Sequence, residues 1–274
     1  MKSHFNKSHG SLAYFLAHPV FTHDEFLAAR VALGGSSKTV NALLHKHLKS
    51  GRLVRVQRGL YASVPGGTNP SDYSPDPYLV SSKLRPDAVV AYHSALAFHG
   101  KAHSTWRRFQ YLTADRPRAV TFRGLEFVGV QAPLSVRRLP DFGGGVVVRP
   151  HAGGEMRVAT LERCLVDVLH SPEQGGGWEE LWRSLEMVEF YDLTAVVEYT
   201  LRLESALTAA RVGFFLDQHR AAWMVEEKHL APLLKRAPAE PRYLDSRRVP
   251  GKLVPRWNLI VPADVLERRW EEPA

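Results

Sequence analysis

The sequence predicts an α+β protein, in which an N-terminal winged helix-turn-helix domain precedes a larger α+β domain whose strands come before its helices. Three observations support this prediction. Three helical patterns and two short strand patterns follow one another within the first 65 residues. Strand-like segments between residues 109 and 149 give way to helical patterns after residue 160. Basic side chains are concentrated near the start of the chain.

The first two helices are predicted from an apolar stripe and from a capping pattern. Leu12, Phe15 and Leu16 recur at helical spacing, and a proline at position 19 ends this helix. Thr22 and Glu25 have the spacing of a capping box, in which each side chain bonds the backbone of the other residue. A second helix is therefore expected to start just after Thr22.

A third helix follows a glycine turn. Gly34-Gly35 ends the second helix and permits a sharp change of direction. Ser36 and Ser37 are suited to cap the third helix, and Gly51 is suited to close it. Its core-facing residues recur at helical spacing and are Val40, Leu43, Leu44 and Leu48.

The opposite face of the third helix is polar. In a helix-turn-helix motif this second helix lies in the major groove of DNA. An asparagine pairs with adenine through two hydrogen bonds, and a lysine reaches guanine or phosphate. The residues expected to recognise bases are Lys38, Thr39, Asn41 and His45.

Residues 52–62 are predicted to form a wing. Two short strand patterns flank the turn Gln57-Arg58-Gly59, whose glycine permits a positive φ. The arginines of such a wing contact phosphates or enter a minor groove, and the N–H groups at a helix start also suit a phosphate. The residues expected to make these contacts are Ser36, Ser37, Lys46, Arg52, Arg55 and Arg58.

The distribution of charge agrees with this assignment. Residues 1–62 contain nine Lys and Arg against two acidic residues, a net charge of +7, whereas residues 63–274 contain 27 basic and 26 acidic residues. Six of the 13 histidines also lie in residues 1–62. A strongly basic N-terminal segment, joined to a nearly neutral remainder of the chain, predicts that the N-terminal segment binds a polyanion. A solvated basic face without a ligand is the alternative.

Composition sets the expected domain boundaries. Residues 1–66 form the DNA-binding domain, residues 67–78 form a proline- and glycine-containing linker, and residues 79–274 form the C-terminal domain. In that domain the expected helices lie at 79–84 and 91–100 and along apolar stripes that begin at 161, 178, 193 and 207, the third of them capped by Asp192. The expected strands are 109–113, 119–122, 125–130, 146–149 and 257–261.

Six segments, taken in order, resemble the AbiEi family of antitoxins and transcriptional regulators. They are Arg58-Gly59-Leu60-Tyr61, His93-Ser94-Ala95-Leu96, His99-Gly100, Thr160-Leu161-Glu162-Arg163-Cys164-Leu165-Val166-Asp167, Ala210-Arg211-Val212-Gly213-Phe214-Phe215-Leu216 and Trp257-Asn258-Leu259-Ile260-Val261-Pro262. The likeness extends over nearly the whole chain. The sequence departs from the family pattern at Gly175-Gly176-Gly177 and at the acidic tail Glu271-Glu272.

The resemblance implies a role in a type IV toxin–antitoxin system, which belongs to abortive infection and phage defence. Such proteins bind inverted repeats in the promoter of their own operon and act as autoregulating repressors. The C-terminal domain of the family counters a nucleotidyltransferase-like toxin without stable binding. The DNA-contacting positions of the family correspond here to residues 36–49 and 52–58.

No enzyme, cofactor or metal is expected from the motifs. The sequence contains neither a Walker phosphate loop nor a dinucleotide-binding glycine motif. His93, His99 and His103 are spaced widely enough to ligate a metal, but no neighbouring cysteine or carboxylate completes a zinc site. Cys164 lies on an apolar helical stripe and is expected in the core.

Two other functions remain open at this point. Asp217 and the triplet Glu226-Glu227-Lys228 contain the residues of a Mg²⁺-dependent nuclease, although that chemistry needs the triplet on a strand and the pattern here is helical. A transcriptional regulator or protein-binding module without an antitoxin role is the second alternative. For it, Arg137-Arg138, Arg242 and Arg247-Arg248 could form a further basic patch.

The remaining expectations concern location and assembly. The sequence has no apolar run long enough to span a bilayer and no signal-peptide pattern, so no membrane partner is expected. A single cysteine cannot form an internal disulfide, which agrees with a reducing cytoplasm. Because no extended dimerisation helix is present, a monomer in solution is expected.

Overall fold

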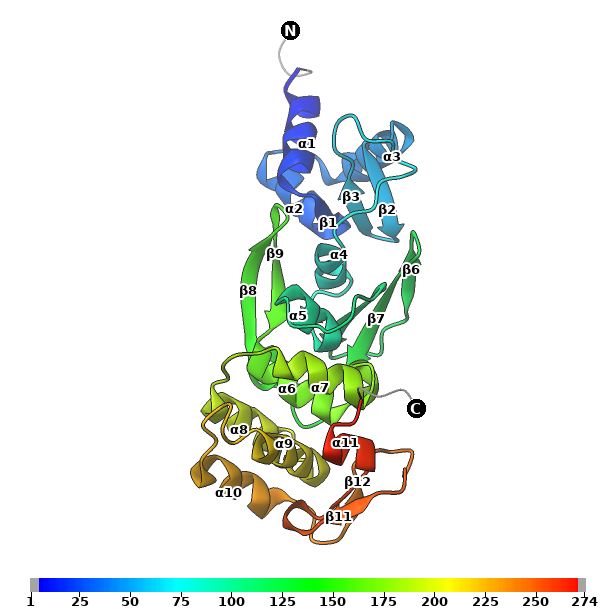
Figure 1. Cartoon of the computed structure of the whole chain (residues 1–274). Helices are drawn as coiled ribbons and strands as arrows, with labels where there is room; N and C mark the ends of the chain where they lie inside the picture. Colours follow the sequence, from blue (N-terminus) through cyan, green and yellow to red (C-terminus); the bar gives the residue numbers. More distant parts are fainter. Residues whose placement is uncertain (1–4, 271–274) are drawn as a thin grey trace.

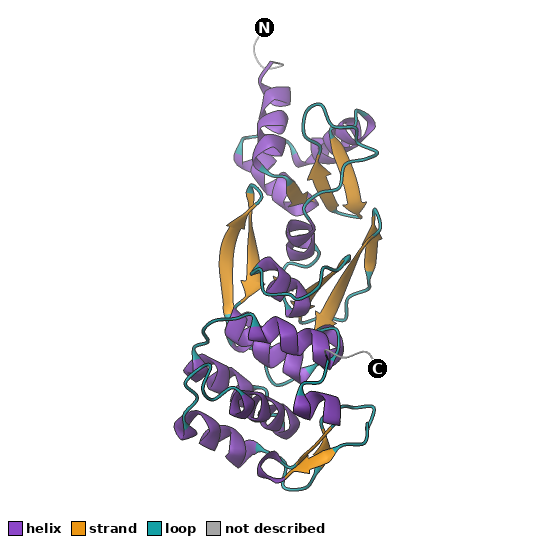
Figure 2. Cartoon of the chain, viewed as in Figure 1, coloured by secondary structure: helices purple, strands orange, loops and turns teal. Residues whose placement is uncertain are grey.

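The computed structural model describes the backbone of residues 5–270 and the side chains from Gly10 onward. Lys2 and the acidic tail Glu271-Glu272 lie outside the described residues, as does the side chain of Lys7. The chain is a mixed α+β protein, as predicted. Helices occur at both ends of the molecule, and the largest sheet lies between them (Figure 2).

The N-terminal unit contains three helices and one small sheet. Its elements are α1 (Phe5–Ala17), β1 (Val20–Thr22), α2 (His23–Ala32), the 3-10 turn η1 (Ser37–Thr39), α3 (Val40–Lys49), β2 (Leu53–Gln57) and β3 (Leu60–Ser63). The strand order is β1-β3-β2, and both pairings are antiparallel. The sequence analysis did not predict the short strand β1.

The capping box at the start of α2 is confirmed. The Glu25 backbone N–H donates to Thr22 Oγ1 at 3.2 Å, and the Thr22 backbone N–H donates to Glu25 Oε2 at 2.7 Å. Gly51 and Gly59 adopt the predicted positive φ values, 71° and 83°. The capping box fixes the start of α2, and the two glycines permit the turns before and after β2.

A six-stranded mixed sheet forms the middle of the molecule, in the order β6-β7-β5-β4-β9-β8. Its strands are β4 (Val89–Val90), β5 (Arg108–Thr113), β6 (Val120–Phe122), β7 (Leu125–Gln131), β8 (Val146–His151) and β9 (Gly154–Ala159). The β6–β7 and β8–β9 hairpins rise on either side of α4 (Pro77–Lys83) and α5 (Tyr92–Phe98), as Figure 1 shows. β4 and β9 were not predicted from the sequence.

We call residues 77–270 the body. It contains the large sheet with α4 and α5, and further helices and a second small sheet lie below them (Figure 1). The helices are α6 (Leu161–His170), α7 (Trp178–Glu186), α8 (Leu193–Arg202), α9 (Ala206–Gln218), α10 (Glu227–Arg236) and α11 (Ala263–Glu267). The strands are β10 (Arg242–Tyr243), β11 (Lys252–Val254) and β12 (Leu259–Val261), in the order β10-β12-β11. The remaining 3-10 turns are η2 (Pro140–Gly143), η3 (Pro172–Gln174) and η4 (Pro255–Trp257).

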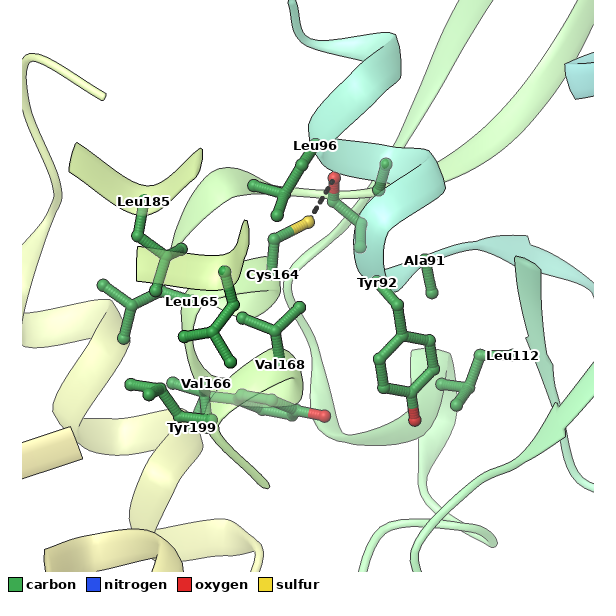
Figure 3. Packing of buried hydrophobic residues seen from close by; sticks show 14 of the residues in the cluster. Ala91, Tyr92, Leu96, Leu112, Cys164, Leu165, Val166, Val168, Leu185 and Tyr199 are labelled. Atoms are coloured by element: carbon green, nitrogen blue, oxygen red, sulfur yellow. Dashed lines mark hydrogen bonds between the residues drawn. The ribbon is translucent and has the colours of Figure 1, made fainter. Parts of the chain in front are cut away.

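Helix α6 lies at the centre of the body. Cys164 is fully buried, as expected, and packs among Leu96, Leu165 and Leu185 (Figure 3). Burial raises the pKa of the Cys164 thiol well above its ordinary value, so the sulfur stays protonated. The single cysteine is therefore a packing residue.

One turn further along α6, Asp167 accepts hydrogen bonds from Arg163 Nε at 3.0 Å and from the Tyr199 hydroxyl at 2.8 Å.

The core consists of two hydrophobic clusters. The boundary between them does not coincide with residue 66, where the sequence analysis placed the end of the DNA-binding domain. The smaller cluster lies within the N-terminal unit and consists of Phe15, Phe21, Phe26, Val40, Leu44 and Leu53. The larger cluster fills the body and also contains Val56 and Leu60 of the β2–β3 hairpin. One side of this hairpin is thus part of the core of the body. Residues 67–76 form the expected loop, and the N-terminal unit is packed against the body rather than suspended from it.

Among the described residues, no helix has both the length and the apolar character needed to cross a bilayer.

Candidate nucleic-acid interface

All four residues predicted to recognise bases are exposed. Lys38 and Thr39 lie in η1, and Asn41 and His45 lie one turn apart on α3. The buried residues of α3 are Val40, Leu44 and His47, so the opposite face of the helix is free of the core. This face has the width and polarity that a major groove accepts.

Helix α3 starts later than the serine caps suggested. Ser36 caps η1, where its hydroxyl accepts from the Lys38 backbone N–H at 3.3 Å. The Thr39 hydroxyl donates to the Ser36 carbonyl at 2.8 Å, and the regular α-helix begins only at Val40. Ser36 and Ser37 are both exposed beside this start.

Asn41 has a partner that the sequence analysis did not anticipate. His23 is the first residue of α2, and its Nε2 lies 3.0 Å from Asn41 Oδ1. The other ring nitrogen of His23 lies 3.1 Å from Asp24 Oδ1. The His23 backbone N–H also donates to the Gly59 carbonyl at 2.8 Å. Contacts therefore run from α3 through His23 to the tip of the β2–β3 hairpin.

The three hairpin arginines, all exposed, occupy different places. Arg58 lies at the tip, next to Gly59. Arg55 lies in the middle of β2, paired in register with Tyr61. Arg52 lies at the base, where it lines an apolar groove together with Leu12 and Phe15. The structure thus brings Arg58, but not Arg52, toward His23 and the start of α3.

The cations of this surface lack neutralising partners. Lys38, Lys46, Arg52, Arg55 and Arg58 make no ion pair with any side chain that the structure describes. His47, on the buried face of α3, has its pKa lowered by burial and further by the charges of Arg52 and Lys46. The binding of a polyanion such as DNA to a surface of unpaired cations is electrostatically favourable.

The residues considered for catalysis lie in other surroundings. Glu226 caps the N-terminus of α10, so the triplet is not on a strand, and its carboxylate accepts from Lys228 Nζ at 2.8 Å. Asp217 accepts hydrogen bonds from Trp257 and Arg220. His93 stacks on Trp106 and lies 3.1 Å from Glu180. Among the described side chains, no three His, Cys, Asp or Glu residues gather as metal ligands would.

Comparison with solved structures finds a similar fold at low sequence identity. No family model matches the sequence, and no curated protein matches it significantly. A crystal structure of the RV2827C protein from Mycobacterium tuberculosis is similar, with a TM-score of 0.53, 18% sequence identity and 94% of each chain covered. At this identity the likeness concerns the fold alone.

Proposed function

We propose that the N-terminal unit is a winged helix-turn-helix domain that binds double-stranded DNA. The observation that carries the proposal is the set of exposed cations without ion-pair partners on α3 and on the β2–β3 hairpin. Helices α2 and α3 supply the helix-turn-helix, and the hairpin supplies the wing. In this proposal Asn41 and His45 face the base edges, while Arg55 and Arg58 meet the phosphates or a minor groove.

The wider proposal is that the chain is a non-enzymatic antitoxin of a type IV toxin–antitoxin system and represses its own operon. Its support is the resemblance to the AbiEi family. Two of the segments that carry this resemblance lie in α6 and α9, where Cys164 and Phe215 are fully buried. The segments that carry the resemblance therefore belong to the core of the body.

Fluorescence anisotropy of the full chain tests the DNA proposal. The DNA would be the segment upstream of the gene, with a scrambled duplex at the same near-physiological salt as reference. The variant Lys46→Ala should weaken binding, whereas Lys235→Ala is the matched control, since both lysines are exposed in the last turn of a helix. Absence of binding to either duplex, or equal effects of the two variants, would favour a module that binds protein.

The antitoxin role has its own test. If a gene for a nucleotidyltransferase-like protein lies beside this one, expression of that protein alone should arrest growth, and co-expression of this chain should restore it. Rescue by the Lys46→Ala variant would show that neutralisation does not require the DNA-binding face. Failure of the wild-type chain to rescue growth would argue against the antitoxin role and leave the DNA proposal standing.

A further inference from the structure

A cleft of about 810 Å³ separates the tip of the wing from the body. The wing tip and the start of α2 form one wall, and the end of α4 with the β8–β9 hairpin forms the other. In Figure 1 the lower end of β2 lies on the side of the N-terminal unit that faces the body. The cleft is therefore built jointly by the proposed DNA-binding domain and by the body.

Four cations line this cleft, one from the wing and three from the body. They are Arg58, Lys83, Arg85 and Arg157. Lys83 is paired with Glu25, and Arg157 donates to Asp141 Oδ1 at 2.6 Å. Arg58 and Arg85 make no ion pair with a described side chain, although the Arg85 guanidinium lies within hydrogen-bonding reach of the buried Tyr111 hydroxyl. Because no carboxylate neutralises either guanidinium, both can attract an anion to the cleft.

The acidic residues of the cleft leave this conclusion intact. Burial alone would raise the pKa of Glu25, but hydrogen bonds from Lys83 and from the Thr22 backbone lower it, so Glu25 is ionised and neutralises Lys83. Asp24 is exposed and has only His23 beside it. Glu155 is exposed and has no cation within ion-pair distance among the described side chains. Asp24 and Glu155 are therefore the acidic groups of the cleft that oppose an anion.

A chain of contacts connects the cleft to α3. Asn41 contacts His23, and the His23 backbone bonds the carbonyl of Gly59, which itself lines the cleft. A DNA duplex that lies on α3 and crosses the wing tip would therefore next reach the cleft. Phosphates repeat along each strand of the duplex, so cations beyond the wing can also bind phosphate.

We infer that the body contributes to the DNA-binding surface: the duplex that occupies α3 continues past the wing tip, and Arg85 holds a backbone phosphate of its flanking segment. The inference rests on the proposed DNA-binding function. Arg85 is then a positioning contact that adds affinity without reading bases. Glu155 limits the affinity of this contact through its charge.

The test compares two duplexes from the upstream DNA. One is the shortest duplex that the full chain binds, and the other is extended at both ends by about ten base pairs, roughly one helical turn. Arg85→Ala should weaken binding to the long duplex about 3- to 10-fold and lower its salt slope by about one, with little effect on the short duplex. Arg242→Ala, an exposed arginine of β10, is the matched control.

A second variant keeps the test independent of the folding of Arg85→Ala. Glu155→Gln removes an exposed negative charge and should strengthen binding to the long duplex about 2- to 3-fold, whereas Glu240→Gln, exposed near α10, should change nothing. Identical behaviour of the cleft variants and their controls on both duplexes would overturn the inference.

The outcomes separate this inference from the function on which it rests. Loss of binding in Lys46→Ala, combined with no effect of the cleft variants, would remove the inference and leave the proposed function in place. Failure of the wild-type chain to bind either duplex would remove both. Stabilisation of the wild-type chain but not of Arg85→Ala by pyrophosphate, together with unchanged DNA binding, would assign the cleft to a small anion and overturn the inference.

Discussion

Asn41 Oδ1 and His23 Nε2 lie 3.0 Å apart, which joins the first turn of α3 to the first residue of α2. The contact leaves the amide nitrogen of Asn41 directed away from His23. Because an amide oxygen can accept two hydrogen bonds, Asn41 can keep His23 and still pair with an adenine. His23 thus holds in place the side chain to which the sequence assigns base recognition.

Replacement of Asn41 by alanine should reduce sequence discrimination. We expect Asn41→Ala to lose about 1–3 kcal/mol of the difference in binding free energy between the upstream and the scrambled duplex, since two hydrogen bonds to one base are removed. Titration of both duplexes with wild type and variant measures this difference. An equal loss of affinity for both duplexes would contradict the assigned role.

Arg55 should act on all sequences alike. It is exposed in the middle of β2, and a contact with phosphate carries no sequence information. Arg55→Ala should weaken both duplexes equally and lower the slope of log K against log salt by about one. Arg242→Ala controls for the loss of an arginine elsewhere. An unchanged salt slope in Arg55→Ala would mean that this arginine does not touch the backbone of DNA.

The cap of α2 should contribute to the stability of the fold. Thr22→Ala removes the acceptor of the Glu25 backbone N–H and the reciprocal geometry of the capping box. We expect a loss of about 1 kcal/mol in the free energy of unfolding. Thr194→Ala is the control, because Thr194 is exposed in the first turn of α8 and does not cap it. Urea denaturation of the three proteins is the measurement, and equal stability of the two variants would refute the prediction.

Asp245 should make folding dependent on pH. Hydrogen bonds from the Arg247 side chain, from the Arg247 backbone N–H and from the Trp178 side chain lower the pKa of Asp245 to about 2. A carboxylate with a lowered pKa stabilises the fold above its unfolded-state pKa, near 4, and this contribution disappears as the pH falls toward 2. Because Arg247 is 73% exposed and solvent screens the pair, this contribution is about 1 kcal/mol at pH 7.

The variant Asp245→Asn isolates this contribution. It should be less stable than wild type at pH 7, and the difference should shrink as the pH is lowered from about 4 to about 2. Asp115→Asn, at an exposed position, serves as control. Denaturant unfolding at pH 7, 4 and 2.5 gives the three comparisons. A difference between wild type and Asp245→Asn that stays constant with pH would contradict the assignment.

Local signals made the N-terminal elements predictable. The capping box depends on residues three positions apart, and the positive φ of Gly59 depends on one residue and its turn. Such features are encoded within a few residues. The apolar spacing on α3 likewise predicted the burial of Val40 and Leu44, whereas the buried His47 was not predicted.

The elements that were missed have physical reasons. β1 and β4 contain three and two residues, too few to display a period, and their pairing partners are distant in sequence. Helix α10 contains Pro232, a residue that normally ends a helix. Tertiary packing places His23 beside Asn41 and Arg85 in the cleft that Arg58 also lines, and no spacing in the sequence reveals this.

Val56 and Leu60 lie in the same core as the strands of the body, so the β2–β3 hairpin is anchored to the body. If the proposed function holds and two copies occupy an inverted repeat, neither copy can swing α3 to follow a change in spacing. One inserted base pair rotates the second half-site by roughly 36°, because the duplex turns once in about ten base pairs. The length of the spacer, rather than the flexibility of the protein, would then decide whether two copies bind side by side.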